Sequence, residues 1–131
     1  MLFKTRGLPF SPCKEDSMIR RQTELSKVEA ELFGGPGKLH SDILLSKEEF
    51  FGKGRLFNHC ILHPGEGIGA HPHNGEFEVY YILKGEGLYN DNGTEQTVRA
   101  GDLTICPSGQ SHGFKNTGSE DLEFIALILF V

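Results

Sequence analysis

The chain has 131 residues, of which 37% are hydrophobic and 24% are charged. This length supports one buried core and leaves no room for a second domain of ordinary size. The formal net charge of −5 disfavours a nucleic-acid surface, which needs clustered Lys and Arg. The longest apolar run, 124–131, is too short to cross a membrane, which takes about 20 residues in a helix. We therefore expect a globular domain with neither nucleic-acid nor membrane partners.

The three cysteines, Cys13, Cys60 and Cys106, are widely spaced and include no C-x-x-C pair. An odd, scattered set indicates neither a disulfide framework nor a thiolate zinc site, and it is typical of a reducing compartment. The first ten residues lack the long apolar stretch of a secretory signal. We expect a cytoplasmic protein in which Cys60 and Cys106 are small core residues.

Residues 1–37 read as an N-terminal extension. Its first part, 1–17, is irregular and is expected to lie outside the core; Met1 and Met18 are alternative starts. Apolar residues at spacings of three and four predict a helical stretch over 24–33. The glycine-rich stretch 34–37 would end it.

From residue 38 onward, short strand-like runs alternate with glycine turns. Strands bounded by Gly, Asn, Asp and Pro at spacings near ten residues are typical of an all-β sandwich or barrel. We therefore expect one β-domain over 38–131, interrupted by a single helical turn at 46–51. The predicted strands are 38–45, 55–63, 77–84, 87–91, 94–99, 103–107, 112–116 and 122–131.

His71 and His73 are two residues apart. On an extended strand such residues share a face and are separated by about 6.6 Å, so two imidazoles can converge on one point. Imidazole is the commonest nitrogen ligand of first-row metals. His112 follows the turn Pro107-Ser108-Gly109 and joins the pair only if the sheet folds back, as barrel closure requires.

A carboxylate is expected to complete this site, and strand parity leaves two candidates. Glu78 is five residues from His73, which places it on the opposite face of an unbroken strand. Asn74-Gly75 intervenes, and this dipeptide favours tight turns that reset the alternation. Glu76 shares the face of Glu78 and is the alternative ligand. Three nitrogens and one oxygen would suit Fe(II), Mn(II), Ni(II), Zn(II) or Cu(II).

Two segments carry a resemblance to a known family. Residues 65–85 read G-x5-H-x-H-x4-E-x6-G, and residues 101–116 read G-x5-P-x-G-x2-H-x3-N. These patterns resemble the two motifs of the cupin superfamily at every fixed position, with the short spacing between motifs that compact single-domain members have. The chain is identified as a member of that superfamily, with one pair of motifs.

The resemblance implies a double-stranded β-helix, or jelly-roll, barrel of the RmlC-like cupin kind. It implies that one divalent metal is bound by His71, His73, Glu78 and His112, which favours Glu78 over Glu76. Small cupins are frequently homodimers, so we expect a homodimer here. Tyr80 and Ile82 share the face of Glu78, and Phe114 shares that of His112. These three residues are expected to line the pocket, while Phe77, Val79, Tyr81 and Leu83 should face a packing layer on the other side.

Two functions remain open at this stage. The first is an enzyme, a dioxygenase, decarboxylase, lyase or isomerase, acting at the metal on a small carboxylate, sugar acid or diketone. The second is a module that binds a small ligand or a metal without turnover, which the lack of a second convincing catalytic group favours. The fold does not decide between them.

Overall fold

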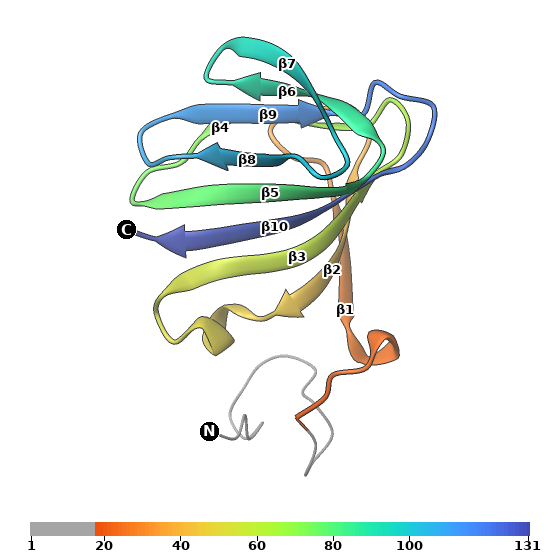
Figure 1. Cartoon of the computed structure of the whole chain (residues 1–131). Helices are drawn as coiled ribbons and strands as arrows, with labels where there is room; N and C mark the ends of the chain where they lie inside the picture. The colour runs from red at the N-terminus through yellow and green to blue at the C-terminus, as the bar shows by residue number, and fades with distance from the viewer. Residues whose placement is uncertain (1–17) are drawn as a thin grey trace.

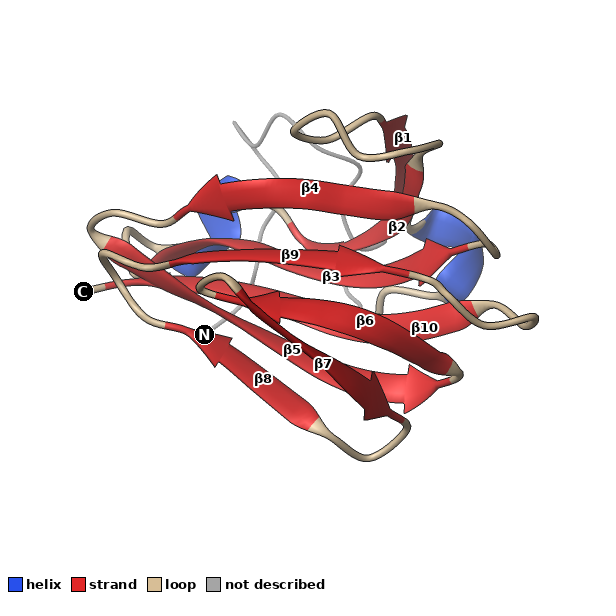
Figure 2. Ribbon diagram, turned by 90° about the horizontal axis from the view of Figure 1, so that it is seen from above, coloured by secondary structure: helices blue, strands red, loops and turns tan. Residues whose placement is uncertain are grey.

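The computed structural model describes residues 18–131, so the expectations for 1–17 lie outside the described residues. The strands form two antiparallel sheets that face each other (Figures 1 and 2). The six-stranded sheet has the order β1 (Ser26–Ala30), β2 (Leu39–Leu45), β3 (Gly54–Leu62), β10 (Leu122–Phe130), β5 (Glu76–Lys84) and β8 (Leu103–Cys106). The four-stranded sheet has the order β4 (Gly67–Pro72), β9 (Ser111–Lys115), β6 (Glu86–Asp91) and β7 (Thr94–Arg99). This is the expected all-β jelly-roll architecture.

Helical structure in the described residues is limited to two short 3-10 turns. The turn η2 (Lys47–Phe50) confirms the helical turn predicted at 46–51. The turn η1 (Gln22–Glu24) precedes the first strand. No helix of the described part of the chain has the length and apolar character needed to span a membrane.

The helix predicted over 24–33 is wrong, because Ser26–Ala30 is the edge strand β1. It pairs in an antiparallel register with β2, with Val28 opposite Ser41. Val28 is 44% exposed, so its apolar side chain does not mark a buried helical face. The open edge of β2 supplies backbone hydrogen bonds along the whole segment, and this pairing overrides the local spacing of apolar residues.

Strand β4 was not among the predicted strands, because Gly67, Gly69 and Pro72 hide its pattern. The glycines have a packing reason. A Cβ atom on Gly69 would lie 1.9 Å from the carbonyl oxygen of Phe33, and one on Gly67 would lie 2.9 Å from that of Phe114. The backbone before β2 therefore lies directly on β4 at Gly69, and β9 lies close to it at Gly67, so that only glycine leaves enough space.

The core lies between the two sheets and is rich in aromatic rings. Tyr80, Phe114 and Phe124 are almost fully buried, and their ring centroids lie 4.8–5.5 Å apart. Cys60 and Cys106 are buried free thiols, as expected from the sequence. The other large side chains of this core are Leu62, Ile68, Ile82, Tyr89 and Leu122.

The outer face of the six-stranded sheet differs from the expectation. Its side chains on β5 were predicted to face a packing layer, yet Tyr81 and Leu83 are each 45% exposed. Phe77 and Val79 are half-buried. Within residues 18–131 no element covers this face, because the chain supplies only two sheets and the second one covers the inner face (Figure 2).

Candidate metal centre

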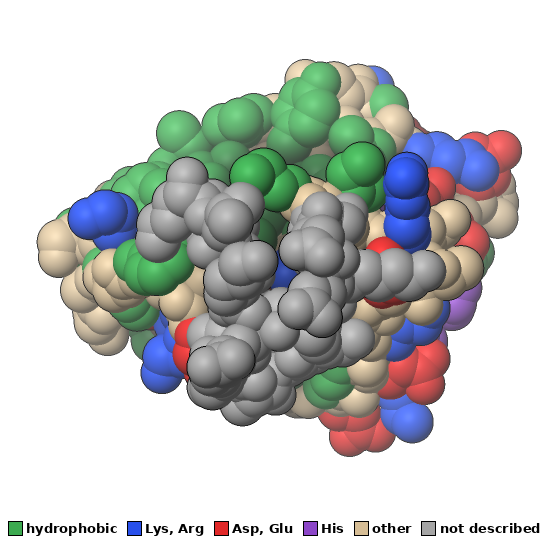
Figure 3. Space-filling model, turned by 90° about the horizontal axis from the view of Figure 1, so that it is seen from below, with side chains coloured by type: hydrophobic (Ala, Val, Ile, Leu, Met, Phe, Trp, Pro, Cys, Tyr) green, Lys and Arg blue, Asp and Glu red, His purple; other side chains and the backbone are tan. Residues whose placement is uncertain are grey.

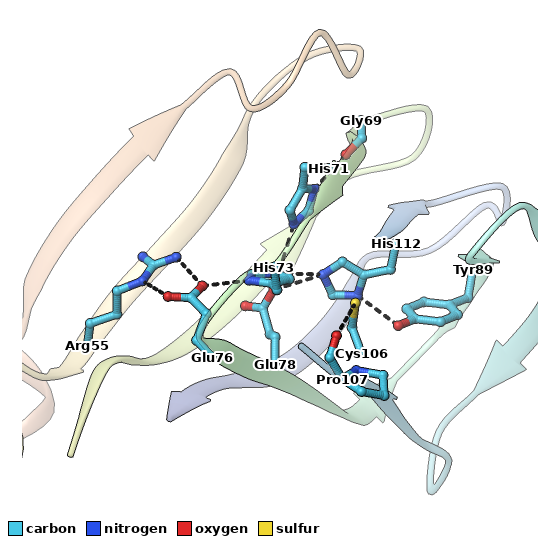
Figure 4. A network of polar contacts seen from close by, with 10 residues as sticks. All are labelled: Arg55, Gly69, His71, His73, Glu76, Glu78, Tyr89, Cys106, Pro107 and His112. Carbon is cyan, nitrogen blue, oxygen red and sulfur yellow. Dashed lines mark hydrogen bonds and ion pairs between the residues drawn. The ribbon is translucent and has the colours of Figure 1, made fainter. Parts of the chain in front are cut away.

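Four buried side chains from both sheets converge on one point, and they are the residues singled out by the motifs. His71, His73, Glu78 and His112 each offer a ligand atom, and these atoms all lie within 4.8 Å of one another. Glu78 Oε1 lies 3.0 Å from His73 Nε2 and 2.9 Å from His112 Nε2 (Figure 4). The Nε2 atom of His71 lies 3.9 Å from the same oxygen.

Strand register explains how distant segments meet here. His71 on β4 lies directly opposite His112 on β9, so their imidazoles stand side by side in the four-stranded sheet. Glu78 comes from β5 in the six-stranded sheet, where it pairs with Cys106 and Ile128. The site therefore spans the interior between the two sheets, as barrel closure requires.

The turn between β4 and β5 decides which glutamate reaches the histidines. Gly75 has a φ of +75°, and the chain turns between Pro72 and Glu76, so strand alternation does not continue from His73 into β5. The turn is held by its neighbour, because Gly109 N–H donates to the carbonyl of His73 at 2.7 Å. Glu78 consequently points at the histidines.

Glu76, the alternative ligand, lies on the far side of His73. Its Oε2 atom lies 2.6 Å from His73 Nδ1, not from Nε2. Its carboxylate also accepts two hydrogen bonds of 2.7 Å from the guanidinium of Arg55. Glu76 is thus placed to orient His73 and not to join it at the common point (Figure 4).

Each histidine of the cluster has a hydrogen-bond partner at Nδ1. Gly69 O lies 2.7 Å from His71 Nδ1, and Tyr89 Oη lies 2.7 Å from His112 Nδ1. A carbonyl and a carboxylate can only accept, so His71 and His73 carry their proton on Nδ1. Their Nε2 atoms are directed at the cluster and are the nitrogens that a metal would bind, which is how metal-binding imidazoles are usually oriented.

Charge in the cluster is set by the balance of burial and hydrogen bonding. Burial acts to raise the pKa of Glu78, but hydrogen bonds from the histidines outweigh it and hold the pKa far below its usual range. Burial lowers the pKa of His112, which favours the neutral imidazole. The site therefore offers an ionised carboxylate beside imidazole nitrogens, the donor set that borderline divalent metals prefer.

A cavity of about 200 Å³ opens beside the cluster. Its wall is mostly apolar, and its polar groups besides the cluster include Arg55, Asn58 and Cys60. Tyr80 also lines it, and burial raises the pKa of this phenol well above its usual value. The remaining lining residues are Leu32, Phe33, Leu39, Leu56, Ile68, Pro72, Phe124, Ala126 and Ile128.

Two other residues expected at the pocket lie elsewhere. Ile82 and Phe114 are buried in the core, and neither is among the residues that line the cavity. Phe114 stacks on Tyr80, with ring centroids 5.5 Å apart. Sharing a strand face with a ligand places a residue inside the barrel, but the depth along the strand decides whether it reaches the cavity.

Sequence reasoning did not single out Phe33, Arg55 or Tyr89. Phe33 stacks on His71 with centroids 4.1 Å apart, although it comes from the loop before β2. Tyr89 lies on β6, two strands away from His71 in the four-stranded sheet, and its position depends on the β6–β9 register, which pairs it with Phe114. A signal for Phe33 was present, since a run of glycines beside an aromatic residue allows close approach of a loop.

Comparison with known proteins identifies the family. The family model described as a cupin domain matches residues 58–128, which is more than half of the chain and contains all four cluster residues. The chain belongs to the cupin family. An oxalate-binding protein from Thermotoga maritima is 44% identical to this cupin over 115 residues, which is 87% of this chain and 95% of that protein.

Solved structures agree with this assignment. The crystal structure of a predicted oxalate decarboxylase from Thermotoga maritima superimposes with a TM-score of 0.82 at 44% identity, and it covers 87% of this chain and 100% of that one. KdgF from Halomonas has a TM-score of 0.68 at 17% identity, covering 85% and 91%, and shows the shared fold alone. A 5-nitrosalicylic acid 1,2-dioxygenase from Bradyrhizobium is 33% identical over 67 residues, 50% of this cupin but only 32% of the dioxygenase.

Proposed function

We propose that this cupin binds one divalent transition metal through His71, His73, Glu78 and His112, and uses it to hold a small carboxylate such as oxalate. The observation that carries the proposal is the convergence of three imidazoles and one ionised carboxylate beside a cavity. When bound, the metal supplies positive charge and open coordination positions for carboxylate oxygens. Fe, Mn, Ni, Zn and Cu all suit this donor set.

The cavity supports a small acidic ligand. Its volume of about 200 Å³ is below the range of roughly 300–1,000 Å³ that drug-sized ligands occupy. Arg55 lines the cavity, and its guanidinium, which donates two hydrogen bonds to Glu76, places a permanent positive charge near the site. The Thermotoga matches at 44% identity are described as an oxalate-binding protein and as a predicted oxalate decarboxylase.

We favour binding over turnover because the described lining offers little acid–base chemistry near neutral pH. Burial raises the pKa of Cys60 to about 12, so its thiol stays protonated. Tyr80 is likewise held in its neutral form. The carboxylate of Glu76 accepts hydrogen bonds from both Arg55 and His73, so it orients His73 and is not available as a catalytic base. A decarboxylase or dioxygenase is the alternative. The oxalate titration described next distinguishes turnover from binding.

The test titrates oxalate into chelator-treated protein and into protein loaded with Mn²⁺, Ni²⁺ or Zn²⁺, using calorimetry. The proposal predicts one oxalate per chain in a loaded form, at least about tenfold weaker binding without metal, and unchanged oxalate recovered afterwards. Release of carbon dioxide from the loaded protein would show an enzyme. Equal binding to the metal-free protein would contradict a metal-held ligand.

We also propose that two copies associate through the outer face of the six-stranded sheet. Tyr81 on β5 lies opposite Leu103 on the edge strand β8, and Ile105 follows on the same face. Leu103 is 54% and Ile105 is 55% exposed, so these side chains form a continuous apolar surface. Figure 3 shows hydrophobic side chains gathered on one side of the molecule. An edge strand with an apolar face is suited to association with a second copy.

We propose the cytoplasm as the compartment of this protein. The supporting observation is that Cys60 and Cys106 are both free thiols. Unpaired cysteines are usual where thiols are kept reduced.

A further inference from the structure

A second cluster of metal-ligating side chains lies outside the cavity, at the far ends of β2 and β3. His40, His63 and Glu66 each offer one ligand atom, and these atoms lie within 4.8 Å of one another. The two imidazole rings are 4.5 Å apart between centroids and tilted by 46°. His40 Nε2 lies 2.9 Å from Glu66 Oε1. The proposed function assigns no role to these residues.

Both histidines contact a carboxylate through Nδ1. Glu29 Oε2 lies 2.6 Å from His40 Nδ1, and Asp121 Oδ1 lies 2.7 Å from His63 Nδ1. A carboxylate accepts, so these contacts hold a proton on Nδ1 and leave Nε2 as the nitrogen that can bind a metal once it is deprotonated. The same arrangement holds His73 against Glu76 in the first cluster. A carboxylate–histidine pair pointing at a third ligand is typical of metal sites.

Glu66 is fixed independently of the histidine rings. Its Oε2 atom accepts from the backbone N–H of Lys38 at 3.0 Å, and its Oε1 atom accepts from the backbone N–H of His63 at 2.9 Å. These bonds hold the carboxylate in one orientation, so the third ligand is pre-positioned. The cluster is more open than the first, since the His63 side chain is half exposed. Water can therefore complete the coordination.

From this geometry we infer a second metal site, formed by His40, His63 and Glu66 and suited to Zn²⁺ or a similar borderline cation. Two imidazoles, one carboxylate and a water give the four-coordinate set that zinc accepts. Glu29 on β1 and Asp121 in the loop before β10 orient the ligands. Bound metal would tie the β1–β2 pair to the β3–β4 turn and stabilise that end of the barrel.

The test is the zinc content of chelator-treated full-length chain after equilibrium dialysis, measured by elemental analysis. We expect two zinc ions per chain in the wild type and one in His63→Ala or Glu66→Gln. His59→Ala is the matched control, because His59 lies on β3 just before His63, between the carboxylates of Asp42 and Glu123, and this variant should still bind two zinc ions. Asp121→Asn should weaken the second site by about tenfold or more.

The variant His112→Ala separates the two sites. It should retain one zinc ion, and zinc should raise its melting temperature; adding His63→Ala should abolish both effects. Failure of the first site alone would give one ion in the wild type and none in His63→Ala. If His63→Ala binds as many ions as the wild type, the second site does not exist. Because His63 is half exposed, its variant should fold even if Glu66→Gln does not.

Discussion

Each histidine of the first cluster holds its Nδ1 atom against a different kind of partner. His71 uses a backbone carbonyl, His73 a carboxylate and His112 a phenol. The carboxylate is the strongest acceptor of the three, and it is itself held by Arg55 through two hydrogen bonds. Glu76 should therefore contribute to metal affinity without touching the metal.

Replacing Glu76 by Gln is expected to lower metal affinity by about 10- to 100-fold, because His73 loses its charged orienting partner. Replacing Glu78 by Gln should lower it further, because the only anionic ligand of the cluster is removed. Competition against a coloured chelator measures both affinities on metal-free protein. A larger loss for Glu76→Gln than for Glu78→Gln would make Glu76 the ligand.

Cys60 is expected to be chemically inert in the folded protein. Burial raises the pKa of its thiol to about 12, and the residue is only 1% exposed. At pH 8 the reactive thiolate is then about one part in 10⁴. Treatment with iodoacetamide at pH 8, followed by peptide mass spectrometry, should leave Cys60 unmodified until urea is added. Equal labelling with and without urea would show that this core opens readily.

At the residue scale, the motifs predicted which side chains would converge, but alternation along a strand could not choose between Glu76 and Glu78. The choice depends on the positive φ of Gly75, which sequence indicates only as a tendency of Asn-Gly. The orienting role of Tyr89 was beyond prediction, because it depends on the register between β6 and β9.

At the element scale, β4 and the loop before β2 act as one unit. Gly69 N–H donates to the carbonyl of Leu32, Gly67 N–H donates to that of Pro36, and Phe33 covers His71. This contact explains how Leu32 and Phe33, in the segment expected to be an N-terminal extension, contribute to the cavity wall. Sequence alone missed it because β4, the strand on which the loop packs, is distant from the loop along the chain.

Replacing Gly69 by Ala should destabilise the protein by about 1–3 kcal/mol, as overpacking usually does. The added Cβ would lie 1.9 Å from the carbonyl oxygen of Phe33, and backbone atoms cannot move aside as a flexible side chain would. Urea denaturation of the metal-free protein measures the change. Gly118→Ala is the control, because its nearest neighbours would be 3.5–3.6 Å away and its stability should change by less than about 0.5 kcal/mol. Similar effects of both substitutions would argue against the close packing of this loop.

At the scale of the whole molecule, the inner and outer faces of the sheets have different surfaces. The inner faces hold the aromatic core and the metal centre, whereas the outer face of the larger sheet leaves Tyr81, Leu83 and Ile105 exposed. The sequence predicted the architecture well, because turn spacing and two motifs constrain a jelly roll. It predicted the outer face poorly, because alternation shows that a strand has two apolar faces and does not show what covers the second.

Replacing Ile105 by Lys should convert a dimer to a monomer, since a charge at the centre of an apolar contact is costly to desolvate. Light scattering after size exclusion measures the mass directly. Gln96→Lys on the exposed strand β7 adds the same charge elsewhere and should leave the dimer intact. A wild-type protein that is monomeric at all concentrations would refute the proposed association.

The central claim is that His71, His73, Glu78 and His112 surround one metal ion. Anomalous diffraction at the metal absorption edge, from crystals of protein loaded with zinc, tests it most directly. The account predicts a peak between the two sheets, about 2.0–2.2 Å from the three Nε2 atoms and a Glu78 oxygen. The absence of a peak at that point, or a peak coordinated by Glu76 in place of Glu78, would contradict it.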